Sequence, residues 1–207
     1  MIFIQSAPNF MPGATKIQSD LNKIREETLK LATDLAPVRK EDLELLSASD
    51  VEHSARKRLL TNHKGVFTTI FEEPAVAYFY RKYLSSRRDA VIFAKTTRHE
   101  FFYWMKGGNV QIVVDDQPLG SYEEATGVLT GTRSKKMIAK LDKTKAESMP
   151  VIIQGKEAGR MSHFQTKGKD VLSQRVFEYV KNDLSPEEEA IILSIAIFEM
   201  VVWRVGN

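Results

Sequence analysis

The chain has 207 residues, of which 43% are hydrophobic and 28% are charged, and its formal net charge is +3. This composition is typical of a soluble globular protein with a sizeable core, and the length suits one domain with an appended element. The chain has no Cys, which excludes disulfides, a thiolate nucleophile and Cys-based metal sites.

The N-terminus shows no targeting signal. Residues Met1 to Ile4 are apolar, but no basic region precedes them, and Pro8 and Pro12 interrupt the apolar stretch. We therefore expect a cytoplasmic protein whose residues 1–14 form a loose arm.

Between residues 15 and 36, apolar side chains recur at alternating intervals of four and three residues. The series is Ile17, Leu21, Ile24, Thr28, Leu31 and Leu35, in which Thr28 is polar. It predicts an amphipathic helix over residues 15–36, ended by Pro37. Two interpretations stay open. The apolar side packs on the protein's own domain, or it binds a protein partner or a second copy of the chain.

A capping box predicts a second helix. The sequence Ser49-Asp50-Val51-Glu52 is typical of a helix start, and the helix would run to about Asn62. Together with the arm and the first helix, it would form an N-terminal helical segment over residues 1–62.

From Gly65 onward the sequence is typical of short strands, rich in Val, Ile, Phe, Tyr and Thr and separated by turn residues. The predicted strands are residues 65–72, 75–83, 90–97, 100–106, 110–114, 119–122, 127–130, 136–141, 151–154, 158–161 and 176–180. Roughly eleven short strands at this spacing indicate a β-sandwich or a closed barrel.

An internal repeat indicates a regular hairpin architecture. Residues 112–122 align without gaps to residues 151–161, and each segment is an apolar strand, a polar turn and an apolar-Gly-x-apolar sequence. Gly120 and Gly159 occupy equivalent places. Glycine there suits a β-bulge or a close approach of two backbones.

The C-terminal segment predicts a helix that is apolar on every side. Ser185 can cap it, Pro186 suits its first position, and Glu188 completes a capping box. Such a helix is buried in protein or in lipid. The apolar run from Ala190 to Trp203 is short for a membrane span and contains Glu199, so we favour burial in protein over a C-terminal tail anchor.

These elements combine into one prediction of the fold. It is mainly β, of the α+β class: a closed antiparallel barrel of about 11–12 strands around the buried hydrophobic helix 186–205, with N-terminal helices outside it. The helix would fill an interior that is too wide for side chains alone. The barrel domain would cover residues 63–207.

This arrangement resembles the Tubby C-terminal-like superfamily, which includes the phospholipid scramblases and the LURP-one-related proteins. The resemblance rests on the order of the elements, on the hairpin Val151-Ile152-Ile153-turn-Ala158-Gly159-Arg160-Met161 and on the terminal helix. The stretches 65–78 and 94–101 look like an uncharacterised bacterial branch. The resemblance implies a barrel whose basic face binds phosphoinositide-like headgroups, although only the charge carries over and the scramblase calcium motif has no matching position.

The strongest charge feature is a basic cluster around one predicted strand. Its members are Arg133, Lys135, Lys136, Lys140, Lys143 and Lys145. On that strand we expect Lys136, Ile138 and Lys140 to face solvent and Met137, Ala139 and Leu141 to face the core. A second cluster, which could enlarge the surface, comprises Arg81, Lys82, Arg87 and Arg88. A solvated edge strand is the simpler interpretation, and an acidic membrane surface, reached as a peripheral protein, is the functional one.

Other functions have weaker support. The four His show no metal-ligand spacing, so we expect no metal site, and no motif indicates a cofactor. Asp115-Asp116 reads as a turn, and His99 is the one residue that we would test first for acid–base catalysis at the barrel mouth. The aromatic run 101–104 could stack bases, but the small net charge disfavours nucleic acid. The leading hypothesis is a non-enzymatic protein that binds acidic phospholipid or another anionic partner, and self-association through helix 15–36 is the alternative.

Overall fold

The structure is a computed structural model, and it describes residues 14–52, 55–57, 60–83, 89–164 and 174–206. Two α-helices lie in these ranges, α1 (Ala14–Leu31) and α2 (Pro186–Gly206), with a short 3-10 helix η1 (Lys40–Leu45). The strands are β1 (Leu46–Glu52), β2 (Ala55–Lys57), β3 (Leu60–Thr69), β4 (Pro74–Lys82), β5 (Ala90–Lys95), β6 (Glu100–Lys106), β7 (Asn109–Val114), β8 (Gln117–Glu123), β9 (Val128–Gly131), β10 (Met137–Leu141), β11 (Ser148–Ile153), β12 (Lys156–Ser162) and β13 (Phe177–Val180).

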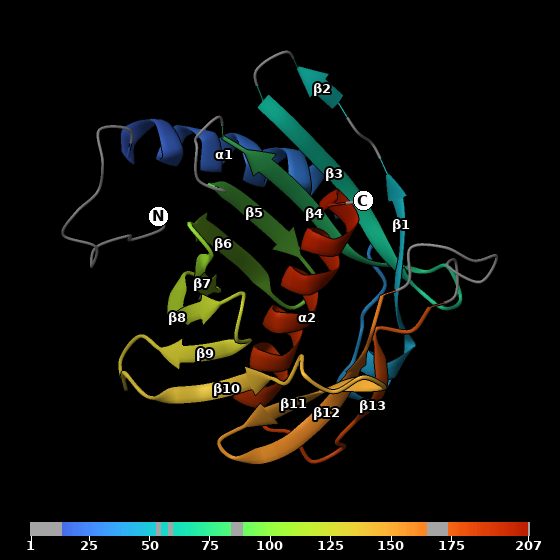
Figure 1. The fold of residues 1–207 in the computed structure, drawn as a ribbon. Coiled ribbons are helices and arrows are strands. Elements are labelled where there is room, and N and C mark those ends of the chain that lie inside the picture. The colour runs from blue at the N-terminus through green and yellow to red at the C-terminus, as the bar shows by residue number, and fades with distance from the viewer. Residues whose placement is uncertain (1–13, 53–54, 58–59, 84–88, 165–173, 207) are drawn as a thin grey trace.

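The strands form one antiparallel sheet that curves into a nearly closed barrel (Figure 1). From β3 to β13 each strand pairs with the next in the chain, β1 lies beside β3, and β2 pairs with β3 outside this path. The two ends of the sheet meet where Val176 N donates to Leu46 O at 2.8 Å and Ala48 N donates to Gln174 O at 3.0 Å. Glu44 of η1 accepts the N–H of Val180 at 2.8 Å, which covers part of the remaining edge.

The helix α2 lies inside the barrel, as predicted (Figure 1). Its residues from Ile191 to Phe198 are all buried. Tyr103 on β6 donates its hydroxyl to Ser194 O at 2.8 Å, and the ring of Phe198 lies 5.5 Å from that of Tyr122 on β8. Each large apolar side chain buried in this way contributes about 1.5–3 kcal/mol. The inner faces of the strands and α2 therefore form one continuous core.

The capping box at the start of α2 is confirmed. Ser185 N donates to the Glu188 carboxylate at 2.8 Å, and Glu188 N donates to the Ser185 hydroxyl at 3.2 Å. These two bonds satisfy backbone N–H groups that the first helical turn leaves unpaired.

The internal repeat corresponds to the hairpins β7–β8 and β11–β12. Both hairpins carry a register shift, between Ile112 and Val113 in the first and between Val151 and Ile152 in the second. A Cβ on Gly159 would lie 2.8 Å from Tyr179 O and 3.1 Å from the Cδ1 of Ile192 on α2. The predicted bulge and close approach are therefore present, and Gly159 lets the sheet pack closely against the central helix.

Two predictions about the N-terminal region are wrong. The segment from Ser49 to Asn62 is not a helix but contains the end of β1, β2 and the start of β3. Antiparallel pairing of β1 and of β2 with β3 outweighs the local capping signal. The sheet thus begins at Leu46, ahead of the expected domain start at residue 63. The first helix ends at Leu31 instead of residue 36, because Ala36 N donates to Pro74 O and draws the chain onto the sheet.

The helix α1 packs on the outer face of the barrel (Figure 1). Leu21 and Ile24 are buried against side chains of β4, β5 and β6, namely Phe79, Val91, Phe93 and Phe102. This confirms the interpretation that the apolar side of the helix packs on the protein's own domain. The seam assigned to a partner in the alternative interpretation is occupied in this structure by the protein's own sheet.

Candidate functional site

The turn between β9 and β10 is a compact loop at the barrel mouth where α2 begins. Gly131 N donates to Lys136 O at 2.9 Å, and Lys135 N donates to Gly131 O at 3.0 Å. Lys135 has φ +54°, and the Ser134 hydroxyl accepts the N–H of Lys136 at 3.2 Å. These bonds hold the backbone in one conformation, so the side chains of the turn project from a fixed base.

Arg133, Lys135, Lys136 and Met137 form what we call the cationic turn. All four are exposed, and Met137 retains 55% of its surface. None of the three cations forms an ion pair with another residue of the described ranges. The prediction that Met137 faces the core is wrong, because the register shifts between Met137 and Ala139 and turns the side chain outward. Ala139 and Leu141 face inward, as predicted.

The other predicted cations of this cluster are spread along β10. Lys140 is half-buried on the outer face, between Val128 of β9 and Ile152 of β11. Lys145 is exposed in the loop after β10, at the opposite mouth of the barrel. Because the first and last of the five residues of β10 are four residue rises apart, its two ends are about 13 Å apart. The predicted basic face is therefore not one continuous cluster.

Lys143 has a structural position instead of a surface one. Its Nζ lies 2.6 Å from Oε1 of Glu199 on α2 and donates to Glu124 O at 3.1 Å. Tyr122 donates its hydroxyl to the same Glu199 oxygen at 2.7 Å. Burial raises the pKa of Tyr122 far above its usual range, and the Glu199 carboxylate raises it further. Lys143 and Tyr122 thus supply the internal partners that a carboxylate on an apolar helix requires.

The second predicted cluster lies elsewhere on the barrel. Arg81 and Lys82 belong to β4, and five strands, β5 to β9, separate β4 from β10. Arg81 pairs with Asp20 of α1 at 3.0 Å and donates to Asn62 at 3.1 Å. Lys82 is exposed. Arg87 and Arg88 lie outside the described residues, so the structure does not place them. The two clusters do not join into one surface through Arg81 and Lys82.

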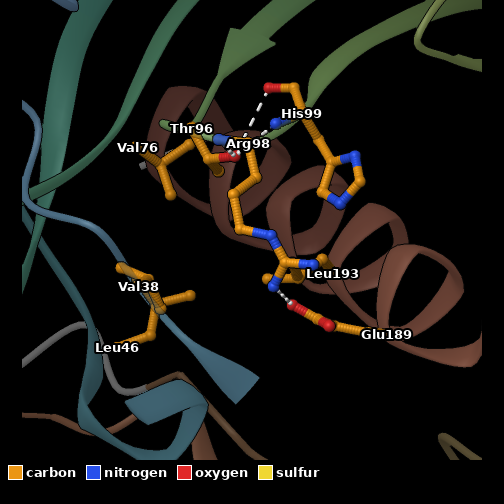
Figure 2. Close-up of a pocket in the computed structure, with 8 residues that line it drawn as sticks. All are labelled: Val38, Leu46, Val76, Thr96, Arg98, His99, Glu189 and Leu193. Carbon is orange, nitrogen blue, oxygen red and sulfur yellow. Dashed lines mark hydrogen bonds and ion pairs between the residues drawn. The ribbon is translucent and has the colours of Figure 1, made fainter. Parts of the chain in front are cut away.

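A crevice opens at the mouth where α2 begins (Figure 2). Figure 2 shows Arg98 reaching from the β5–β6 turn toward Glu189, with the His99 ring above Leu193. Arg98 Nη1 lies 2.7 Å from Oε1 of Glu189, whose side chain is 4% exposed. Only about 10 Å³ of the crevice can admit a water-sized sphere, which suits about one water molecule.

His99 forms a hydrogen-bonded pair at this crevice. Its Nδ1 lies 2.6 Å from Oδ2 of Asp115, and Oδ1 of Asp115 accepts the N–H of Glu100 at 2.9 Å. Nε2 of His99 is buried and has no hydrogen-bond partner among the described residues. Asp115 and Asp116 both have positive φ, +48° and +63°, in the β7–β8 turn, so the turn prediction is confirmed. The geometry of a His–Asp pair is present, but the adjacent space is too small for an organic substrate.

An open groove of about 550 Å³ lies at the opposite mouth, along the β10–β11 loop and the end of β12. Its lining carries charges of both signs: Lys143 and Lys145 together with Glu147 and Glu178. His163 Nε2 lies 2.8 Å from Lys145 O, which ties the groove walls together. Because these charges offset one another, the groove provides no strong attraction for an anion.

Sequence reasoning missed the two ion pairs that anchor α2. The presence of Glu189 and Glu199 in a buried helix was a signal that cations must approach it, but the sequence did not identify Arg98 and Lys143 as those cations. Within the described part of the chain, no group of three or more His, Asp or Glu is placed to hold a metal ion. Nor does any described helix have the length and apolarity needed to cross a bilayer.

No family model, curated protein or solved structure matches this chain. The resemblance to Tubby-like barrels therefore stays a prediction.

Proposed function

We propose that this protein is a non-enzymatic binding protein that recognises acidic phospholipid, as a peripheral protein, through the cationic turn. One observation carries the proposal: three exposed cations without ion-pair partners among the described residues lie within four residues of a methionine that is 55% exposed, on one hydrogen-bonded turn. The resemblance to Tubby-like barrels, whose basic face binds phosphoinositide-like headgroups, points in the same direction.

The physical basis has two parts. Each Lys or Arg near an anionic leaflet contributes about 1 kcal/mol, so Arg133, Lys135 and Lys136 together contribute about 3 kcal/mol, or roughly a hundredfold in affinity. Met137 is flexible and apolar, and it can enter the boundary between headgroups and acyl chains while the cations stay at the phosphates. Because the turn backbone is already fixed, little ordering is required on binding.

Contacts within the fold make several of the other predicted cations less available for binding a lipid. Lys143 and Arg81 are engaged within the fold by Glu199 and Asp20. Hydrogen bonds from Thr144 lower the pKa of the Asp142 carboxyl, and the charges of Lys140 and Lys145 lower it further. The proposed site is therefore smaller than the sequence suggested.

Vesicle co-sedimentation tests the proposal. We expect the protein to bind vesicles of phosphatidylcholine with phosphatidylserine and to dissociate from them at raised salt concentration. It should not bind vesicles of pure phosphatidylcholine. The R133A/K135A/K136A variant should lose most of this binding. A matched control, K23A/K82A/K145A, removes three exposed cations elsewhere and should bind as the wild type does.

Substituting Met137 separates insertion from charge. M137S should weaken binding with no change in net charge, whereas L29S, at an apolar residue 42% exposed on α1, should not. Equal partitioning onto neutral and anionic vesicles would refute the proposal. Binding to a single-stranded oligonucleotide without binding to either vesicle would instead favour the nucleic-acid alternative.

A further inference from the structure

The turn between β3 and β4 displays an aromatic side chain between carboxylates. Phe71 retains 67% of its surface, and Glu72 and Glu73 beside it are exposed. Neither carboxylate forms an ion pair with another residue of the described part of the chain. We call Phe71, Glu72 and Glu73 the acidic turn. It has the opposite charge to the cationic turn, and both carry one exposed large apolar side chain.

Hydrogen bonds hold the acidic turn in one conformation. The Thr69 hydroxyl accepts the N–H groups of Phe71 at 3.2 Å and of Glu73 at 3.3 Å. Thr69 N donates to Glu73 O at 2.8 Å, and Glu72 N donates to Thr69 O at 2.9 Å. Glu72 has φ +64°, a conformation that is uncommon for a residue other than glycine. Because the backbone is already fixed, this turn can bind a partner with little further ordering.

The acidic turn and the cationic turn lie at the same mouth of the barrel, on opposite sides of it. Ile70 N, next to the acidic turn, donates to Leu45 O, and Leu46 lines the crevice together with Glu189 at the start of α2. The path through the sheet contains twelve strands besides β2, and six of them, β4 to β9, separate the two turns. The turns are therefore half of the ring apart. Figure 1 shows them at opposite edges of the barrel.

This arrangement makes the mouth complementary to the same mouth of a second copy. If two mouths face each other across a two-fold axis at right angles to the line joining the two turns, each acidic turn meets a cationic turn. The β5–β6 turn lies two strands from the acidic turn, and the β7–β8 turn lies two strands from the cationic turn. The same rotation therefore brings Arg98 of one copy, which is exposed although it pairs with Glu189, toward the exposed Asp116 of the other. Opposite charges thus meet at two separate pairs of turns.

We propose that the mouth at which α2 begins is an interface for a second copy of the chain, in a symmetric dimer that joins the acidic turn of each copy to the cationic turn of the other. Phe71 and Met137 meet at the centre of each contact, where a thioether against an aromatic ring is favourable. The surrounding charges select this orientation, because other rotations bring like charges together. The dimer covers the cationic turn, so self-association and membrane binding exclude each other. The proposal itself does not depend on lipid binding, since it needs only the two turns.

A pair of charge-reversed variants tests the interface. In E72K/E73K both turns are basic, and in R133E/K135E/K136E both are acidic. We expect light scattering to give twice the 23.5 kDa of one chain for the natural protein, falling at raised salt concentration, and the mass of one chain for each variant alone. An equimolar mixture of the two variants should regain the doubled mass, because every basic turn then meets an acidic one. The chain that carries all five substitutions should regain it alone.

The matched control is E26K/E123K, which changes the net charge as E72K/E73K does, but at exposed carboxylates away from this mouth, and should remain dimeric. F71S should weaken association with no change in charge. A natural chain that keeps the mass of one chain up to about 1 mM, or variants that do not associate on mixing, overturns the proposal. If a charge-reversed variant does not fold, F71S and the salt series decide, and a dimer that neither weakens overturns it.

Vesicle binding separates this proposal from the proposed function. E72K/E73K keeps the whole cationic turn, so it should still bind anionic vesicles although it no longer associates with itself. Loss of the dimer with vesicle binding intact therefore concerns the interface alone, and a dimer that forms without any vesicle binding counts against the lipid proposal alone.

Discussion

Replacing Lys143 with Met should destabilise the fold, although the sequence placed this residue in a surface cluster. The substitution removes the cation from Glu199 and the donor from Glu124 O, and leaves the Glu199 carboxylate with Tyr122. The side chains of Lys143 and Glu199 are 27% and 15% exposed. The pair is therefore intermediate between a surface ion pair and a fully buried one.

The expected cost follows from that position. Breaking a buried pair costs about 3–5 kcal/mol, and an exposed pair is worth about 0–1 kcal/mol, so we expect about 2 kcal/mol for K143M. This is about a 30-fold change in the unfolding equilibrium. Urea unfolding followed by the fluorescence of Trp104 and Trp203 measures it.

The matched control is K136M, which removes a cation from the exposed cationic turn and should change stability by less than about 0.5 kcal/mol. In a double-mutant cycle, K143M and E199Q should show a coupling free energy of about 1–2 kcal/mol, because they remove the same interaction. Equal urea midpoints for K143M and K136M, or additive effects in the cycle, would refute the structural role assigned to Lys143.

Two further predictions concern α2. F198A should lower the free energy of unfolding in urea by about 3–5 kcal/mol, since Phe198 is a fully buried residue of α2. V205A, near the end of the same helix, should lower it by only about 1 kcal/mol. Similar costs for the two variants would mean that the helix is not enclosed. The Ser185 backbone N–H and hydroxyl hold the pKa of the Glu188 carboxyl below its ordinary value, so Glu188 stabilises the fold above the unfolded pKa and loses this effect as the pH falls through the folded pKa. The stability difference between wild type and E188Q should accordingly shrink below about pH 4, and a constant difference from pH 7 to pH 3 would contradict the cap.

Local patterns predicted most of the fold. The eleven strands expected from Gly65 onward correspond to β3 through β13, and the apolar segment after Ser185 forms the enclosed helix. These features are set by short-range periodicity and turn chemistry, which one sequence contains. The helix prediction for residues 49–62 was wrong because the capping signal is weak compared with strand pairing, and the local sequence does not reveal the partner strand.

The candidate site was predicted only in part, because the roles of its cations depend on distant partners. Lys143 is separated by 56 residues from Glu199, and Arg81 lies far along the chain from Asp20. Composition does not distinguish these cations from one another. Only the fold shows which of them form ion pairs with helices and which face solvent. The exposure of Met137 depended on a register shift that no pattern in the strand indicates.

The enclosed position of α2 has a consequence for biosynthesis. Every strand of the barrel precedes α2 in the chain, so for a period on the order of ten seconds the ribosome has released strands whose inner faces have nothing to cover them. The barrel cannot acquire its native packing until α2 arrives. Nascent chains at this stage should be strong clients of holding chaperones, and a translational pause before Ser185 would prolong their exposure to aggregation.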